Sequence, residues 1–199
     1  MDKYDVSYDQ YCYDNSSVLK NKLNINDIYG FEKAERDITS ITILKVSYSP
    51  PPYNIYYFKL LHKAIFSETF DWAGKIRTVD ISKNNTRFCN VNRIEPEVEK
   101  LFSQLENEQW LIGLEKEEFC KKLAEYYCEF NMIHPFREGN GRVQRLFFEH
   151  LALSAGYELD WQDIEVTEWI NANIDGVFVN YEPMKIIFKR IIKVAVNYF

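Results

Sequence analysis

The chain has 199 residues, of which 46% are apolar and 16% aromatic, enough to bury one sizeable core. Its net charge is −6, and an acidic chain without basic runs does not attract a phosphate backbone, so composition argues against direct nucleic-acid binding as the main role. No apolar run approaches the ~20 residues needed to span a membrane, and the polar N-terminus is unlike a signal peptide. We therefore expect a single domain, 1–199, in the cytoplasm.

The four cysteines support an intracellular, reduced protein. They form no C-x-x-C pair and show no zinc-finger spacing with histidine: Cys12, Cys89, Cys120 and Cys128. Cys120 and Cys128 fall within a helical pattern, where a free thiol usually behaves as a small core hydrophobe.

In the first third of the chain, two helical patterns are separated by prolines. Residues 24–46 carry apolar side chains at helical spacing, with Asn26 or Asp27 as the candidate N-cap. The run SPPPYN at 49–54 interrupts this pattern, because consecutive prolines cannot continue a helix. Residues 55–70 then resume an apolar helical stripe.

Residues 74–91 are the one segment with a β pattern, because β-branched and polar residues alternate around Lys83, Asn84 and Asn85. Helical patterns return in four later segments: 95–109, 115–133, 141–156 and 181–196. No internal repeat or linker composition divides the chain. The sequence thus predicts an all-α, mainly helical domain with one small β-hairpin.

The segment HPFREGNGRVQR, from His134 to Arg145, stands out between two helices with strongly apolar faces. Those helices are expected to be buried and to pack side by side. A polar loop at the mouth of a rigid helix pair is a suitable mount for a precise site.

The second half of this loop has the residues of a phosphate-binding site. Gly139 and Gly141 bracket Asn140 just before a helix, and glycines at positive φ can turn successive N–H groups inward toward an anion. The N-terminus of the following helix adds its dipole and free amides. Arg142 and Arg145 lie three residues apart on that helix, and guanidinium groups suit phosphate oxygens.

The first half supplies the groups of a transfer reaction. Glu138 could hold Mg²⁺, because this ion takes one or two carboxylates together with phosphate oxygens. His134 has the chemistry of a general base for a hydroxyl nucleophile, and Phe136 is expected to anchor the loop in the core. Together these residues predict Mg²⁺-assisted transfer from a nucleotide to a hydroxyl.

Each residue also has a plain structural interpretation. A single histidine at a helix end is more often structural than catalytic, Arg142 and Arg145 could pair with Glu149 or other surface acids, and Gly-Asn-Gly is a common turn. A nucleotide-binding module without catalysis is a further alternative, against which His134 and Glu138 argue. A metal hydrolase is disfavoured because His62, His134 and His150 show no ligand spacing.

The loop resembles the signature of the Fic family, H-P-F-x-(D/E)-G-N-G-R-x-x-R, and every position of that signature is filled from His134 to Arg145. The upstream segment 61–88 resembles the part of Fic proteins that leads into a hairpin called the flap, including the run W-A-G-x-x-R at Trp72–Arg77. The resemblance covers a core of about residues 55–160, with compatible flanking helices.

The resemblance implies a helical enzyme that transfers AMP from ATP to a protein hydroxyl. His134 would deprotonate the target side chain, and Glu138 would hold Mg²⁺. The loop glycines, Asn140 and Arg142 would hold the α- and β-phosphates, and Arg145 the γ-phosphate. The hairpin at Ser82, Lys83 and Asn84 would clamp the target as an added β-strand beside the α-phosphate.

Gly141 bears on the choice of reaction, because related toxins with Lys at that position phosphorylate instead. AMP transfer is favoured here, with a phosphotransferase of the same fold as the alternative; the loop alone does not exclude transfer of other phosphate-linked groups.

Regulation follows from a further comparison with the family. Many Fic proteins carry an inhibitory helix with the pattern [ST]-x-x-x-E-[GN]. Only Ser154 and Glu158 have this spacing here, and Leu159 follows in place of Gly or Asn. The chain therefore resembles Fic toxins that are silenced by a separate small antitoxin, whose implied targets are the ATPase subunits of DNA gyrase and topoisomerase IV.

Overall fold

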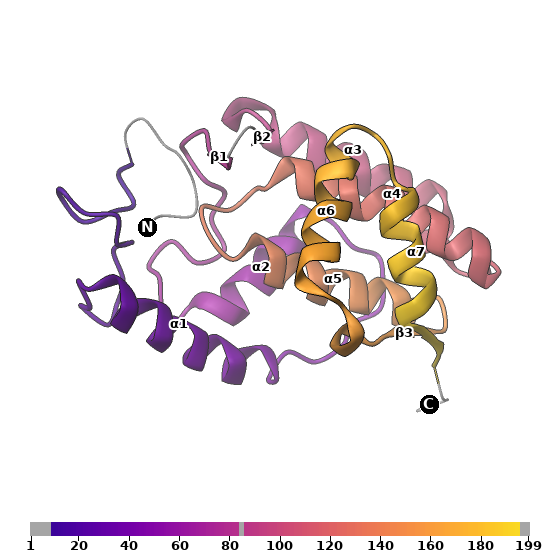
Figure 1. Cartoon of the computed structure of the whole chain (residues 1–199), viewed down its shortest axis with the longest axis horizontal. Coiled ribbons are helices and arrows are strands. Elements are labelled where there is room, and N and C mark those ends of the chain that lie inside the picture. The colour runs from indigo at the N-terminus through magenta and orange to yellow at the C-terminus, as the bar shows by residue number, and fades with distance from the viewer. Residues whose placement is uncertain (1–8, 84–85, 196–199) are drawn as a thin grey trace.

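The computed structural model describes residues 9–83 and 86–195. Helices dominate this part of the chain, which confirms the expected fold class (Figure 1). In chain order the helices are α1 Ile28–Ile43, α2 Ile55–Phe66, α3 Ile94–Asn107, α4 Lys116–Ile133, α5 Asn140–Ser154, α6 Val166–Val177 and α7 Glu182–Ile191. Three short 3-10 turns lie between them, at Val91–Arg93, Gln109–Leu111 and Trp161–Asp163.

The first two helices begin where side chains cap them. Asp27, one of the two predicted N-caps, accepts a hydrogen bond from the N–H of Gly30 at 2.6 Å. Asn54, two residues after the last proline of the run at 50–52, does the same for Tyr57 at 3.0 Å. A side-chain oxygen that accepts from a free N–H of the first turn is the usual stabilising start of a helix.

The core is rich in phenylalanine and lies between α2, α3, α4 and α5. Phe130 of α4 and Phe147 of α5 lie 5.5 Å apart between ring centroids, and both also contact Phe58 of α2 and Phe102 of α3. All four rings are buried. The expected side-by-side packing of the helices before and after the polar loop is thereby confirmed, and these aromatic contacts make the pair a rigid support.

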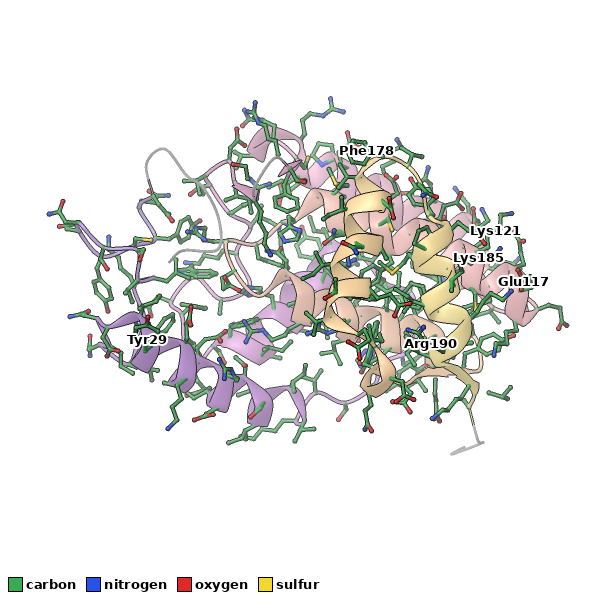
Figure 2. All side chains as sticks on the ribbon, in the orientation of Figure 1. Tyr29, Glu117, Lys121, Phe178, Lys185 and Arg190 are labelled. Atoms are coloured by element: carbon green, nitrogen blue, oxygen red, sulfur yellow. The ribbon has the colours of Figure 1, made fainter. Side chains whose placement is uncertain are left out.

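The C-terminal helices cover α4. Helix α7 packs along α4, where Lys185 and Lys189 form ion pairs with Glu117 at 3.2 and 2.6 Å. Figure 2 shows Lys185 and Glu117 on neighbouring helices at this contact. Helix α6 also packs on α4, and its segment was not among the predicted helices.

Two antiparallel strand pairs complete the described chain. The predicted hairpin is present as β1 Ser82–Lys83 and β2 Thr86–Arg87, with Ser82 opposite Arg87 and Lys83 opposite Thr86. Asn84 and Asn85, at its predicted turn, lie outside the described residues. The second pair, β3 Tyr157–Leu159 with β4 Ile192–Val194, was not expected. The predicted helix 181–196 therefore ends earlier than expected, at Ile191. The residues that follow, which include β-branched side chains, form β4 and pair with β3, the strand after α5.

Candidate active site

His134 is the residue at which α4 ends. Its backbone is left-handed, with φ of 47°, and its side chain is buried with 8% exposure. The ring Nδ1 lies 2.6 Å from the carbonyl oxygen of Asn131. A carbonyl can only accept, so Nδ1 carries the proton and the lone pair of the neutral ring is on Nε2. This tautomer is the one that a base acting through Nε2 requires.

Burial keeps that imidazole neutral. Removal from water lowers the pKa of His134 from 6.5 to about 4, with a smaller contribution in the same direction from Arg77. A charged ring is disfavoured because the surroundings solvate it poorly. His134 is therefore a neutral acceptor of protons at physiological pH.

The hairpin β1–β2 lies against His134. The ring of Phe88, directly after β2, stacks on the imidazole with 3.9 Å between centroids and 19° between planes. Phe88 also packs with Ile81 and Val79 in a small apolar cluster of its own. In Figure 1 the hairpin lies beside the loop that joins α4 to α5. The structure thus brings the predicted flap residues Ser82 and Lys83 to the same end of the molecule as His134.

The loop between α4 and α5 is fixed by its own side chains. Asn140 accepts a hydrogen bond from the N–H of Phe136 at 2.8 Å and donates to the Phe136 carbonyl at 2.7 Å. The Phe136 ring is fully buried and lies 4.0 Å from that of His62, which confirms the expected anchor. The side chain of Asn140, predicted as part of the phosphate site, is therefore used to shape the loop that presents the backbone.

The two glycines of the loop have different roles. Gly139 has φ of 80°, and a Cβ there would lie 2.2 Å from the ring of Phe66, so both its conformation and its contacts require glycine. Gly141 lies within α5 without positive φ, contrary to the expectation that both glycines bend the loop. An added Cβ at Gly141 would meet nothing within 4 Å. The space over the first turn of α5 is thus open, as a bound phosphate group would need.

Glu138 lies beside this open helix end. Its Oε1 accepts from the N–H of Gly139 at 2.9 Å and lies 3.6 Å from Nη2 of Arg142, and the residue is buried with 8% exposure. Within the described ranges, no group of three or more His, Cys, Asp or Glu side chains could hold a metal ion. A single carboxylate beside a phosphate site fits a Mg²⁺ ion that is held mainly by the phosphates.

The two arginines of α5 differ in their partners. The guanidinium of Arg142 pairs with Glu35 of α1 at 2.5 Å, donates to the hydroxyl of Thr39 at 2.8 Å, and lies 4.7 Å from the centroid of Phe66. Arg145 has no side-chain hydrogen bond or ion pair within the described chain. Glu149, the partner considered from the sequence, accepts a hydrogen bond from the indole of Trp161 at 2.5 Å. Burial raises the pKa of Glu149, and the nearby charge of Arg145 acts to lower it.

Comparison with known proteins agrees with this geometry. The Fic/DOC family model matches residues 52–152. The chain belongs to the Fic/DOC family. A relative from Escherichia coli K12, described as a probable protein adenylyltransferase Fic, is 38% identical over 98% of this chain and 97% of its own. Protein adenylyltransferase VbhT from Bartonella schoenbuchensis is 37% identical over 96% of this chain, which covers 40% of VbhT. The predicted enzyme class, protein adenylyltransferase, is confirmed.

Solved Fic structures extend the comparison to bound nucleotides. The BepC effector protein from Bartonella tribocorum, with bound AMPPNP, has a TM-score of 0.85 at 28% identity and covers 94% of this chain and 97% of its own. The Fic domain of a Bep effector from Bartonella quintana, with bound ADP, has a TM-score of 0.86 at 30% identity, covering 93% and 95%. ATP as the predicted co-substrate is supported by these two structures.

The Fic loop has supports that the sequence did not suggest. Arg137, the variable position of the signature, is fully buried, and its Nε donates to Asp9 at 2.8 Å. Glu35 and Thr39 of α1, four residues apart, hold Arg142 from about a hundred residues away in sequence. The sequence showed that these two residues share one face of a predicted helix. It did not show which other helix that face would contact.

The candidate inhibitory pair, Ser154 and Glu158, lies on no common helix. Ser154 is the last residue of α5 and its hydroxyl donates to the carbonyl of His150 at 2.8 Å, whereas Glu158 is in β3 opposite Lys193 of β4. This arrangement agrees with the interpretation of Glu158 as a surface acid. Within the described ranges, no helix combines the length and the hydrophobicity that crossing a membrane requires.

Proposed function

We propose that this protein transfers AMP from ATP to a hydroxyl side chain of a target protein, with the loop from His134 to Arg145 as its active site. The observation that carries the proposal is the position of His134. Its buried, neutral imidazole donates Nδ1–H to the carbonyl of Asn131, stacks on Phe88 directly after the hairpin, and belongs to the residue that begins the loop into α5. This position supports the proposal that a base, a phosphate site and a target clamp lie next to one another.

The reaction assigns one role to each group. Nε2 of His134 takes the proton of the target hydroxyl, whose oxygen forms a bond to the α-phosphorus of ATP. The bond from that phosphorus to the β-phosphate oxygen breaks, and pyrophosphate leaves with the electron pair. The amides at the start of α5, together with Arg142 and Arg145, balance the charge on the phosphates. Glu138 would hold Mg²⁺, which supplies further charge neutralisation when bound.

A labelled-ATP experiment tests this function. Purified protein is incubated with bacterial lysate and ATP labelled at the α-phosphate, and label on protein is measured after any bound inhibitor is removed. The His134→Ala variant should lose ~10²- to 10⁴-fold in rate, the usual contribution of a general base. Label from the γ-phosphate in place of the α-phosphate would assign the protein as a phosphotransferase instead, and an active His134→Ala variant would remove the assigned base.

The same proposal extends to the biological setting. The chain acts in the cytoplasm as the toxin of a toxin–antitoxin pair, and a small antitoxin supplies an inhibitory helix whose carboxylate pairs with Arg145. This inference is supported by the absence of a side-chain hydrogen bond or ion pair of Arg145 in the described chain and by the separation of Ser154 and Glu158 into different elements. The proposed targets are the ATPase subunits of DNA gyrase and topoisomerase IV.

The mass of those subunits provides the test of the target. The intact mass of each subunit is measured after reaction with ATP and the protein, with the His134→Ala variant as control. A gain of one AMP, located by peptide mapping, would support the target. Unchanged masses in a lysate where other proteins become labelled would reject the topoisomerases while leaving AMP transfer standing.

A further inference from the structure

Arg77, the last residue of the run Trp72–Arg77, is a buried arginine whose donors serve backbone carbonyls. It is 2% exposed. Its Nε donates to the carbonyl of His134 at 2.8 Å, and its Nη2 to that of Ile133 at 3.3 Å. Nη1 donates to the carbonyl of Val79 at 2.7 Å, and Nη2 also donates to that of Cys89. One guanidinium thus joins the end of α4 to both sides of the hairpin.

The backbone around Arg77 strengthens the same junction. The N–H of Arg77 donates to the carbonyl of Pro135 at 2.9 Å, and the N–H of Cys89 donates to that of Met132 at 3.0 Å. A cation beside the last carbonyls of a helix is favoured by the helix dipole. Without these carbonyls, the buried guanidinium would have nothing to replace the water that it has lost. The charge of Arg77 therefore favours the arrangement in which the end of α4 and the hairpin segments surround it.

Asp80 continues the junction on the solvent side. Its carboxylate lies 3.8 Å from Nη1 of Arg77 and accepts from Arg87 of β2 at 3.1 Å. It also accepts from the side chain of Asn90 at 2.9 Å and from the N–H of Val91 at 2.8 Å. The pKa of Asp80 is lowered, chiefly by the hydrogen bond from Val91. Both chain segments that leave the hairpin are therefore held by one charged pair.

The start of the same run holds the other end of the loop. The N–H of Gly74 donates to Nδ1 of His62 at 2.8 Å, so the ring proton is on Nε2, which donates to the carbonyl of Glu138 at 3.1 Å. His62 is fully buried. The run Trp72–Arg77 therefore contacts the loop directly at His134 and, through His62 of α2, is linked to it at Glu138.

We propose that Arg77 is the positioning residue that sets the hairpin against His134, so that a hydroxyl clamped by the hairpin meets Nε2 at the reacting distance. The inference rests on the proposed function for its reaction, and on the contacts above for its geometry. A lysine in this place would keep the charge but could not reach four carbonyls, because its ammonium is a single point whereas the guanidinium is a planar fork. Arg77 itself touches neither ATP nor the target.

The test compares Arg77→Lys with the wild type and with Arg93→Lys, the same change at an exposed arginine whose side chain forms an ion pair with Glu97. ATP affinity is measured by calorimetry and AMP transfer with α-labelled ATP. For Arg77→Lys we expect an ATP Kd within about threefold of the wild type and a transfer rate lower by roughly 10²-fold, the loss that ~1 Å of misplacement can cause. Arg93→Lys should match the wild type in both.

A spectroscopic readout reports the geometry directly. The imidazole Hε1 signal of His134 is expected at an upfield position in the wild type, because the Phe88 ring stacks 3.9 Å away. In Arg77→Lys this signal should move toward the position of a free histidine while the ATP affinity is retained. These two measurements remain informative even if no AMP transfer is found, so failure of the proposed function is distinguishable from failure of this inference.

Three results would overturn the role of Arg77: transfer by Arg77→Lys at the wild-type rate, a parallel loss of ATP affinity and transfer, or lost transfer with an unmoved His134 signal. If Arg77→Lys does not fold, Asp80→Asn decides, since the Asp80 side chain is 37% exposed and its loss leaves the core intact. That variant should bind ATP normally and transfer AMP about tenfold more slowly, again as misplacement predicts. Wild-type transfer by Asp80→Asn would then reject the proposal.

Discussion

At the residue scale, the loop separates the groups that shape the backbone from those that could react. Asn140 is used within the loop, since both of its amide atoms bond the backbone of Phe136. Gly139 permits the bend, and His134, Glu138 and the arginines are the groups to which we assign the proposed reaction. Part of the signature, namely Phe136, Gly139 and Asn140, therefore serves the conformation of the loop.

Gly139 provides a prediction with a matched control. Alanine at Gly139 would combine the cost of positive φ with a contact of 2.2 Å to Phe66, whereas alanine at Gly113, with φ of 82°, would meet nothing within 4 Å. We expect Gly113→Ala to lower the free energy of unfolding by about 1–2 kcal/mol and Gly139→Ala by roughly 1–3 kcal/mol more, measured by urea denaturation. Gly139→Ala should also bind ATP more weakly. Equal losses from the two substitutions would show that Phe66 moves aside.

At the scale of elements, α6 depends on a close approach to α4. Gly176 of α6 is buried, and a Cβ there would lie 2.7 Å from Sγ and 3.0 Å from Cβ of Cys128. The thiol of Cys128 is free and buried, as expected from the sequence. A glycine inside a helix normally weakens it, so its presence here is explained by the contact between the helices.

Replacement of Gly176 should therefore act against the usual trend for helices. Gly to Ala in a helix interior ordinarily adds about 1 kcal/mol of stability, but Gly176→Ala should lower the free energy of unfolding by roughly 1–3 kcal/mol through overpacking. In a Cys128→Ala background the same change should cost less, with a coupling of about 1 kcal/mol. Urea denaturation of the two single variants and the double variant measures this. Strictly additive effects would contradict a direct contact.

At the scale of the whole molecule, the histidines of the fold are held neutral. Burial lowers the pKa of His62, His134 and His150 from 6.5 to about 4 in each case. They contact different parts of the chain: the Glu138 carbonyl, the Asn131 carbonyl and the hydroxyl of Tyr57, respectively. Folding therefore disfavours the protonated form of all three histidines, which lie in different parts of the molecule.

The protein should lose stability as the pH falls from about 6.5 toward 4. In this window the unfolded chain binds protons at its histidines and the folded chain does not, so acid favours unfolding. The slope is at most ~1.4 kcal/mol per pH unit for each histidine. Urea denaturation at pH 7, 6 and 5 measures it, and a His150→Phe variant should give a shallower slope. Equal stability at pH 7 and pH 5 would contradict the assigned neutral, buried state.

Local patterns in the sequence were sufficient for most helices and for locating the loop between α4 and α5. Apolar spacing, the cap at Asp27 and the prolines after Ser49 defined α1 and α2, because those signals act within a few residues of the chain. The segment of α6 was missed because its outward side is apolar as well, with Val166, Ile170 and Phe178 at least half exposed, so no single stripe marked it. The strand β4 was missed because only its pairing with β3 distinguishes it from a continued helix.

By itself, the sequence determined which reactive groups stand together: an imidazole, a carboxylate, a glycine-bracketed turn and two arginines within twelve residues. Tertiary structure alone decided how they are held. Arg77 reaches His134 from 57 residues away, Glu35 and Thr39 reach Arg142 from α1, and Phe88 reaches the imidazole from the hairpin. The physical reason is that spacing along a chain fixes only near neighbours, whereas burial and directed hydrogen bonds between distant segments arise only when the chain has folded.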